Sequence, residues 1–356
     1  MAYEVFNFNL MFASSVRLQG LDVDVRFLLA PKEISTKIIH FIILAKNLHR
    51  MDPRNQTIIT EFVLFGFTMN MTINIVLFIL FSVIYIVTTV GNSLIICMVI
   101  INPKLHRPMY VFLCMLSILD LCYSSTVLPR LLTDLLSTKR TISRFACAIQ
   151  IYVILFVEGS ECQLLAVMAY DRYIAICRPL HYSISMRWSI CYRLVSCVFI
   201  ASFMLCVFPS LFSPLTICYN QINHFMCEML AIIKLSCENI SASEHIVFSI
   251  SFITLLLPLM FILLSYASII SSILKMRSTR RSKAFSTCTS HLAVVALYFG
   301  TVMLMYFGPS SMYSTDQEKY SSIFYVIVSP MLNPLIYSLN NREVKESFNR
   351  FLSKFT

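Results

Sequence analysis

Long apolar stretches without charge constrain this chain more than any other feature. Residues 75–101 read "IVLFILFSVIYIVTTVGNSLIICMVII" and residues 248–274 read "FSISFITLLLPLMFILLSYASIISSIL", and neither stretch holds a charged side chain. A helix that crosses a bilayer needs about 20 consecutive, mostly apolar residues. The chain is 58% hydrophobic and 13% charged, whereas a soluble domain has about 25% charged residues. A lipid bilayer is therefore the natural solvent for this chain.

Seven stretches are predicted to be spans, which makes the expected fold an all-α membrane protein, a seven-transmembrane helix bundle. Prolines inside several of them are tolerated, because neighbouring helices can satisfy the freed backbone groups. The predicted spans are residues 74–101, 108–132, 147–175, 191–213, 246–274, 285–308 and 320–340.

The basic residues predict which way the spans run. Connections on the side of the C-terminus hold more than twice as many Lys and Arg residues as the opposite connections, counted from Met51. Positive charge is retained in the cytoplasm, so we expect a multi-pass plasma-membrane protein with its N-terminus outside and its C-terminus inside. The net charge of +10 then reports topology, and no nucleic-acid partner is expected.

Glycosylation sequons and cysteines agree with this orientation. Asn55 begins the sequon Asn-Gln-Thr, and further sequons begin at Asn70 and Asn239; glycans are added on the side that becomes extracellular. Four of the 13 cysteines fall on the oxidising outer side, where disulfides persist. Four cysteines allow three pairings, and spacing alone does not choose among them. The four are Cys147, Cys218, Cys227 and Cys237.

An acid and a base stand side by side at the inner end of the third predicted span. The stretch "MAYDRYIAIC", residues 168–177, contains Asp171, Arg172 and Tyr173. Charge is tolerated at the end of a span, and Arg172 alone could be an ordinary cytoplasmic anchor. The adjacent pair could instead form a switch between two helix packings that differ by a few kcal/mol.

Five motifs together resemble a known family. They are "LHRPMY" (105–110), "MAYDRYIAIC" (168–177), "SY" (265–266), "KAFSTCTSH" (283–291) and "PMLNPLIYSL" (330–339), in the order and on the spans that the family shows. From Met51 to its end, the chain resembles the odorant receptors, a branch of the rhodopsin-like G-protein-coupled receptors. The resemblance implies binding of a small volatile odorant and activation of the heterotrimeric stimulatory G protein of the olfactory type, which raises cAMP.

The resemblance also assigns roles to single residues. It implies that Asp171 holds Arg172 at rest and that Arg172 reaches the G protein in the active state, with Tyr173 beside it. It pairs Cys147 with Cys227 and Cys218 with Cys237. It also implies that two helices rearrange on activation, the seventh span at its Asn-Pro-x-x-Tyr pattern and the fifth at its tyrosine. These residues are Asn333, Pro334, Tyr337 and Tyr266.

Two acids are expected near the middle of the membrane. A charge there is costly, so Asp120 and Glu161 should face the bundle interior. The resemblance places a sodium ion or a proton-sharing water cluster between them, since two carboxyl groups in one small site do not ionise independently. The alternative is that both acids are only hydrogen-bonded to Ser and Asn. No other cofactor is expected.

Glu158 departs from the family pattern, which has a small residue at the matching place. It lies three residues before Glu161 and therefore on the same helix face. It could tune the shape of the pocket as a neutral acid, or it could bind the ligand. Burial and the nearby Glu161 favour the neutral acid, which would suit carbonyl odorants; an ionised Glu158 would suit amines.

The odorant pocket is expected between the outer halves of spans three, five and six. Small-molecule sites are mostly apolar with a few polar groups. At Phe299 the order "YFGT" replaces the usual order of the family, so a tyrosine-based trigger is not expected there. The matching positions are Ile154, Leu155, Glu158, Ile250, Ser251, Thr254, Phe299, Val302, Met303 and Tyr306.

The chain is expected to have four parts. Residues 1–50 do not match the family and are expected to be a disordered extension or an upstream start included in the gene model. Residues 51–73 would form the extracellular N-terminus, residues 74–340 the bundle, and residues 341–356 an amphipathic helix on the inner lipid surface. No catalytic motif is found, so an enzyme is not expected. A rhodopsin-like receptor outside olfaction, for another small molecule, is the remaining alternative.

Overall fold

The computed structural model describes residues 59–211, 217–237, 241–275, 278–307 and 315–340, together with Val344. These residues belong to one unit, Thr57–Thr356. Asn55, the expected extension 1–50 and all of the expected amphipathic tail except Val344 lie outside the described residues.

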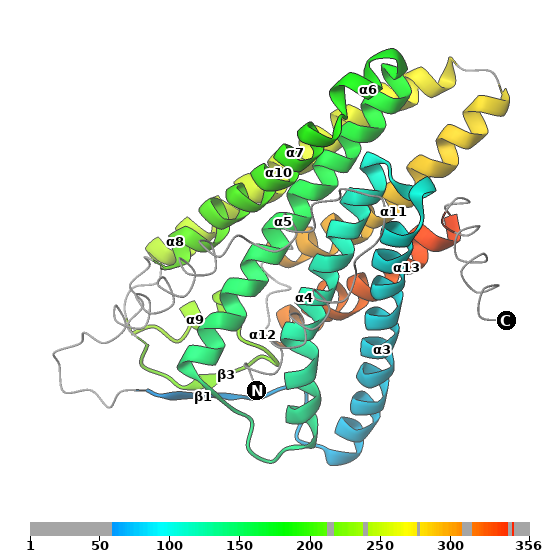
Figure 1. Ribbon diagram of the computed structural model, residues 1–356. Helices are drawn as coiled ribbons and strands as arrows, with labels where there is room; N and C mark the ends of the chain where they lie inside the picture. The colour runs from blue at the N-terminus through cyan, green and yellow to red at the C-terminus, as the bar shows by residue number, and fades with distance from the viewer. Residues whose placement is uncertain are drawn as a thin grey trace, which may run out of the picture. The chain divides into compact units, whose positions relative to one another are not determined.

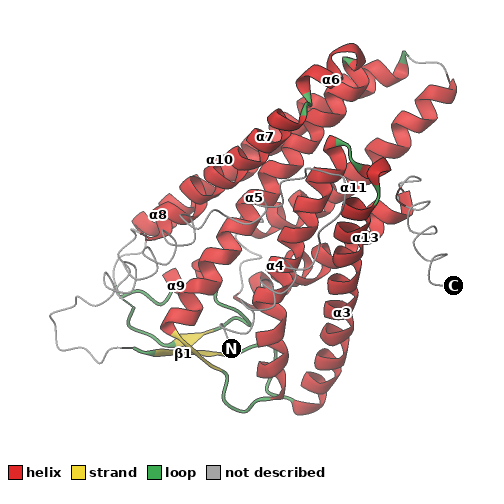
Figure 2. Ribbon diagram, in the orientation of Figure 1, coloured by secondary structure: helices red, strands yellow, loops and turns green. Residues whose placement is uncertain are grey.

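Seven helical segments form the bundle, which confirms the predicted fold class (Figures 1 and 2). Five are long and apolar enough to cross a membrane, while the apolar part of the sixth is shorter, Cys288–Met303. Several run past the predicted bounds. The segments are α3 (Met71–Ile101), α4 (Pro108–Leu136), α5 (Arg144–Cys177), α7 (Trp188–Ser202) continued by the π-helical η4 (Phe203–Val207) and α8 (Phe208–Leu211), α10 (Ser241–Leu274), α11 (Ser278–Phe307), and α12 (Thr315–Ile323) continued by η6 (Phe324–Val328) and α13 (Ser329–Asn340).

Polar caps explain why some helices begin outside the apolar runs. The Asn70 side chain accepts hydrogen bonds from the backbone N–H groups of Thr72 and Ile73, and so starts α3. The Ser143 hydroxyl group does the same for α5 by accepting from Ala146. These side chains satisfy backbone donors that the first turn of a helix leaves free. Short helices complete the connections: η2 (Pro103–Leu105), η3 (Pro179–His181), α6 (Tyr182–Ser185) and α9 (Met229–Ile233).

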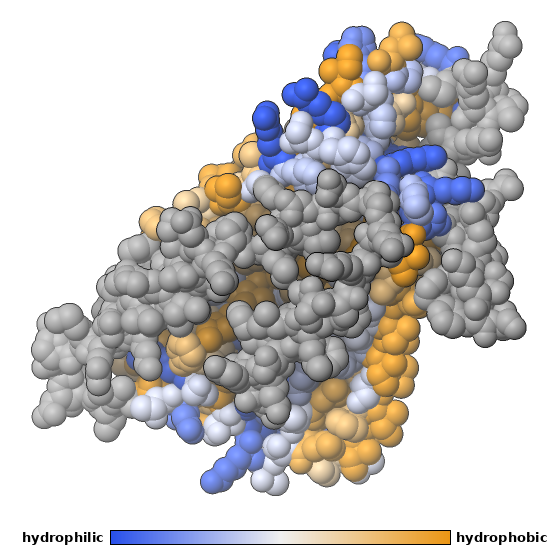
Figure 3. Space-filling view, viewed as in Figure 1, coloured by the Kyte–Doolittle hydropathy of each residue, from blue (hydrophilic) through white to orange (hydrophobic). Residues whose placement is uncertain are grey.

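The third span, α5, is the centre of the bundle. It contacts α4, α7, α10 and α11, and α13 closes the bundle against α3 and α11. Apolar side chains on α3 and α10 face outward: Val76 is 60% exposed and Leu257 is 63% exposed. Figure 3 shows the resulting apolar surface along α3, with hydrophilic residues gathered at the ends of the helices. In a bilayer this surface contacts lipid.

A small sheet closes one end of the bundle. The central strand β1 (Glu61–Leu64) pairs antiparallel with β2 (Thr141–Ser143) and parallel with β3 (Gln221–Ile222). The buried side chains of Phe62 and Leu64 pack in one cluster with the residues around the Cys147–Cys227 bridge. In Figure 1 this sheet lies at the end of α5 opposite to α6. The segment before the first span thus contributes the central strand of the sheet that covers this end of the bundle.

Arg140 fastens the chain that follows β1. Its guanidinium group donates hydrogen bonds to the carbonyl oxygens of Phe65 and Thr68, at 2.8 and 3.1 Å. Gly66, between them, has a positive φ of 64°, which a residue with a side chain adopts at a cost. A Cβ atom at Gly66 would also lie 2.8 Å from Arg140 Nη1. The turn at Gly66 therefore depends both on a residue without a side chain and on the Arg140 hydrogen bonds.

Candidate functional site

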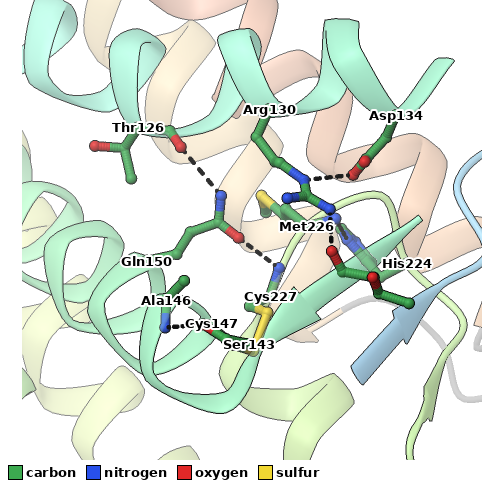
Figure 4. The surroundings of a disulfide bond; sticks show 11 residues. Thr126, Arg130, Asp134, Ser143, Ala146, Cys147, Gln150, His224, Met226 and Cys227 are labelled. Carbon is green, nitrogen blue, oxygen red and sulfur yellow. Dashed lines mark hydrogen bonds and ion pairs between the residues drawn. A yellow bond between two sulfur atoms is a disulfide. The ribbon is translucent and has the colours of Figure 1, made fainter. Parts of the chain in front are cut away.

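A lid covers the sheet end of the bundle; we use this word for residues 217–237. Disulfides join Cys147 to Cys227 and Cys218 to Cys237, the pairing expected from the resemblance. Gln150 on α5 adds a second link (Figure 4): its side chain accepts from the Cys227 N–H group at 2.9 Å and donates to the Thr126 carbonyl oxygen of α4 at 3.1 Å. The Cys147–Cys227 bridge and Gln150 fix the lid to the N-terminal end of α5.

His224 connects the lid to the seventh helical segment. Its Nδ1 accepts from the Met226 N–H group at 3.2 Å, so Nε2 bears the proton of a neutral ring; Nε2 lies 3.2 Å from Ser322 Oγ and 3.1 Å from a Glu228 oxygen. Burial, followed by the positive charges of Lys319 and Lys234, lowers the pKa of His224 to about 3. The Glu228 contact is therefore a hydrogen bond from a neutral imidazole ring.

A cavity of about 800 Å³, counting the space at its mouth, lies under the lid between α5, α10 and α11. Six residues predicted for the pocket are on its wall: Leu155, Glu158, Ile250, Ser251, Thr254 and Val302. The structure does not place three of the other four there. Ile154 and Phe299 are buried in the packed core, and Met303 is half-buried away from the wall. The Tyr306 side chain lies outside the described residues.

Other residues on this wall were not predicted. Tyr298 takes the place expected of Phe299, and it lies four residues before Val302, so helical spacing from Val302 would have found it. Cys206 and Pro209 belong to the fourth helical segment, and Met229 and Ile233 come from the lid. No pattern within the spans points to lid residues, because their position depends on the Cys147–Cys227 bridge.

Glu158 has defined partners on this wall. The Tyr123 hydroxyl group of α4 donates to Glu158 Oε1 at 2.9 Å. The Tyr298 hydroxyl group donates to the Glu158 carbonyl oxygen at 2.8 Å, and it accepts from the Cys162 thiol at 3.3 Å. Glu158 is half-buried, whereas Asp120 and Glu161 are 1% and 5% exposed. Of these three acids, Glu158 is the one open to the cavity.

Asp120 and Glu161 lie deeper in the bundle. The Asn333 amide group donates to both Asp120 carboxyl oxygens, at 3.0 and 3.1 Å. Glu161 Oε1 is buried with no hydrogen-bond partner among the described residues, and so is Asn333 Oδ1. Carboxylate and amide oxygens are the ligands that hard cations prefer. Glu161 Oε1 therefore lacks a partner that a cation or a shared proton would supply.

Asp171 and Arg172 form an ion pair at the other end of α5. Arg172 Nη2 lies 2.7 Å from Asp171 Oδ2, and the Tyr182 hydroxyl group donates to Asp171 Oδ1 at 2.9 Å. Asp171 is fully buried and Arg172 is mostly so. The ring of the neighbouring Tyr173 has the Arg178 guanidinium group 6.0 Å from its centre. Both Asp171 oxygens thus have partners.

The remaining predicted switch residues lie in the half of the bundle that is farther from the lid. Tyr266 is hydrogen-bonded to His291, whose role the sequence did not suggest, at 2.9 Å. The Tyr337 side chain is buried, and its hydroxyl group has no hydrogen-bond partner among the described residues. Pro334 packs against Gly91 so closely that a Cβ atom there would lie 3.0 Å from Pro334 Cγ. These contacts join α10 to α11 and α13 to α3.

Comparisons with known proteins agree with the motifs. A family profile described as "Olfactory receptor" matches residues 81–354. Olfactory receptor 5AR1 of Mus musculus is 44% identical over 307 residues, which cover 85% of this chain and 99% of that protein. Olfactory receptor 5p57 of Mus musculus is 45% identical over 308 residues, covering 85% and 98%. The crystal structure of squid rhodopsin aligns with a TM-score of 0.64 at 17% identity, covering 81% of this chain and 87% of that one.

Proposed function

Because this chain belongs to the olfactory receptor family and is thus an odorant-sensing G-protein-coupled receptor, we propose that it signals through the stimulatory G protein of the olfactory type and raises cAMP. It acts as a receptor and not as an enzyme. The observation that supports this proposal most is the Asp171–Arg172 pair at 2.7 Å, held at the end of α5 opposite to the lid.

The receptor is a multi-pass membrane protein, and we assign the lid end to the outside. The two disulfides of the lid would persist on the oxidising side. The opposite end bears Arg172 and the connections rich in Lys and Arg, which stay in the cytoplasm. The N-terminus would then be extracellular and the C-terminus cytoplasmic.

The cavity under the lid is the proposed odorant site. Small-molecule sites are concave and mostly apolar, with a few polar groups that orient the ligand. The wall is mostly aliphatic, with Glu158, Ser251 and Thr254 as polar groups. Ile154, Phe299 and Met303 would support this wall from behind. A volatile ligand offers few atoms for contact, so its affinity would be modest.

The proposed signal runs along α5 from this cavity to the ion pair. In the resting state Asp171 holds Arg172. Ligand-driven rearrangement would break that pair and free Arg172 for the G protein, with Tyr173 beside it. Pro334 removes a backbone donor from α13, so the helix can bend there. Tyr337, whose hydroxyl group lacks a partner among the described residues, and Tyr266 could then form new contacts.

We further propose that a sodium ion binds at Asp120 and Glu161 with help from Asn333. The unpartnered Glu161 oxygen supports this assignment. The ion would neutralise buried carboxylate charge and stabilise the resting packing.

The experiment that tests the coupling proposal compares Arg172→Ala with Arg193→Ala in cells that supply the olfactory stimulatory G protein. Arg193 is an exposed residue at the same end. We expect odorant-driven cAMP to be lost in Arg172→Ala and kept in Arg193→Ala, at equal surface expression. Full signalling by a well-expressed Arg172→Ala receptor would contradict the proposal.

A further inference from the structure

We propose that the cavity selects small molecules that carry a basic amine group, and that the ammonium group of the ligand pairs with the Glu158 carboxylate. This inference rests on the proposed role of the cavity as the odorant site. It names the ligand class that the wall of this particular receptor favours.

The position of the Glu158 carboxyl group is the first argument. Glu158 lines the cavity, and Tyr123 occupies its Oε1 atom with a donated hydrogen bond of 2.9 Å. Among the described residues, nothing donates to its other oxygen. The side chain is therefore held in place by one oxygen, while the second remains for a ligand. A held carboxyl group loses little side-chain entropy when the ligand binds, which favours affinity.

The charges around the cavity are the second argument. None of the described residues on the wall is Lys, Arg or His, whereas Glu158 is an acid. Glu161 and Asp120 lie deeper, off the wall, where the proposed sodium ion would neutralise them. An acid on a wall that lacks basic side chains makes the cavity favourable for a cation. A charge pair in such a low-dielectric site is also stronger than the same pair in water.

The direction of the Tyr123 hydrogen bond is the third argument. Hydrogen bonds to an ionised acceptor are about twice as strong as bonds between neutral groups. Tyr123 therefore stabilises the carboxylate that the amine needs. The pair also forms if the empty site holds the neutral acid, because the proton then moves from Glu158 to the nitrogen of the free amine. Whether the site starts as a carboxylate with an ammonium ion or as a carboxylic acid with a free amine, the product is the same carboxylate–ammonium pair.

The rest of the wall restricts the size and polarity of the ligand. Leu155, Ile250 and Val302 offer aliphatic surface, and the hydroxyl groups of Ser251 and Thr254 can accept further bonds from an ammonium group. Thr254 donates its own proton to the Ile250 carbonyl oxygen at 2.8 Å, so its oxygen remains an acceptor. A short linear or cyclic primary amine matches this combination.

Binding is tested on the purified full-length receptor by thermal stabilisation. The probes are short linear and cyclic primary amines, each with the alcohol and the ketone or aldehyde of the same carbon skeleton. We expect the amines to stabilise the wild type more than their neutral partners. In Glu158→Gln the apparent affinity for amines should fall at least roughly tenfold, which corresponds to 1.4 kcal/mol. Glu61→Gln changes an exposed acid of β1 in the same way and should bind like the wild type.

Tyr123→Phe is the second variant, in case Glu158→Gln does not fold. It removes the donated bond and keeps the carboxyl group, so the preference for amines over neutral partners should persist. Neutral ligands that bind more tightly than amines to the wild type would overturn the proposal, and so would equal amine affinity in Glu158→Gln. Failure to bind any amine would overturn it too. Amine binding without a cAMP response would contradict the coupling proposal instead, and would leave this inference standing.

Discussion

Tyr266 on α10 and His291 on α11 share a hydrogen bond of 2.9 Å between the phenol oxygen and Nδ1 of the imidazole ring. The other ring nitrogen, Nε2, lies 3.1 Å from the Leu165 carbonyl oxygen of α5. Because a carbonyl group only accepts, Nε2 bears the proton and the Tyr266 hydroxyl group donates to Nδ1. One neutral histidine thus ties three helices together between the cavity and the Asp171–Arg172 pair.

Tyr266→Phe should destabilise the resting receptor. It leaves His291 Nδ1 buried without its donor, at a cost of about 1–3 kcal/mol. We expect the midpoint of thermal unfolding of the purified receptor to fall. Tyr219→Phe, at an exposed site in the lid, should leave the midpoint unchanged. Equal midpoints for Tyr266→Phe and Tyr219→Phe would show that the bond does not hold the helices together.

Cys147→Ser should sharply reduce delivery of the receptor to the cell surface. The Cys147–Cys227 bridge spans a sequence separation of 80 residues, and a bridge of this kind contributes about 2–4 kcal/mol, mainly by restricting the unfolded state. Surface labelling measures the effect, with Cys122→Ser as the control because Cys122 is a free, exposed cysteine. Mass mapping that found Cys147 as a free thiol in surface receptor would refute the pairing.

The lid should lose stability in acid because of His224. Its pKa is lowered from 6.5 to about 3 in the folded state, so the unfolded state binds more protons between these values. The stability contributed by the neutral ring is therefore complete above about pH 6.5 and is lost as the pH falls toward 3. We expect the thermal midpoint of the wild type to fall in this range more steeply than that of His224→Gln.

A control for the acid effect is His181→Gln, which alters an exposed histidine at the other end of the bundle. This variant should follow the wild type at each pH. A wild type and a His224→Gln variant with parallel pH profiles would mean that His224 does not limit the stability of the lid.

Sodium should stabilise the resting receptor through Asp120. We expect a higher thermal midpoint in sodium chloride than in choline chloride at the same concentration, since the larger organic cation does not fit between buried carboxyl groups. Asp120→Asn should abolish that difference, whereas Asp134→Asn, on the same helix near its C-terminal end, should keep it. A wild type that responds equally to both salts would contradict the sodium assignment.

The sequence predicted the fold because the feature that decides it is local. Uncharged runs such as residues 75–101 identify a span by themselves. Their ends are less well predicted: the Asn70 cap adds a turn to α3, and α11 begins at Ser278, before the apolar run from residue 285. The strand Glu61–Leu64 was not predicted, because its pairing partners lie about 80 and 160 residues further along the chain.

The candidate site was predicted in part for the same reason. Glu158, Ser251 and Thr254 stand out in apolar spans, and the structure places all three on the cavity wall. Tyr298 was missed because Phe299 was chosen one residue out of register, a shift that turns a side chain by about 100° around a helix. Met229 and the Tyr123–Glu158 bond depend on contacts between distant segments, which no single stretch of sequence reveals.

The most direct test of the account measures cAMP in cells that express the full-length receptor with or without the α subunit of the olfactory stimulatory G protein. The cells should lack that subunit themselves, and surface labelling should confirm that the receptor is delivered. A broad panel of volatile compounds is applied, including the primary amines. The account predicts that at least one compound raises cAMP, and only when the α subunit is present. A delivered receptor that raises cAMP with none of them, or raises it equally without the α subunit, would contradict it.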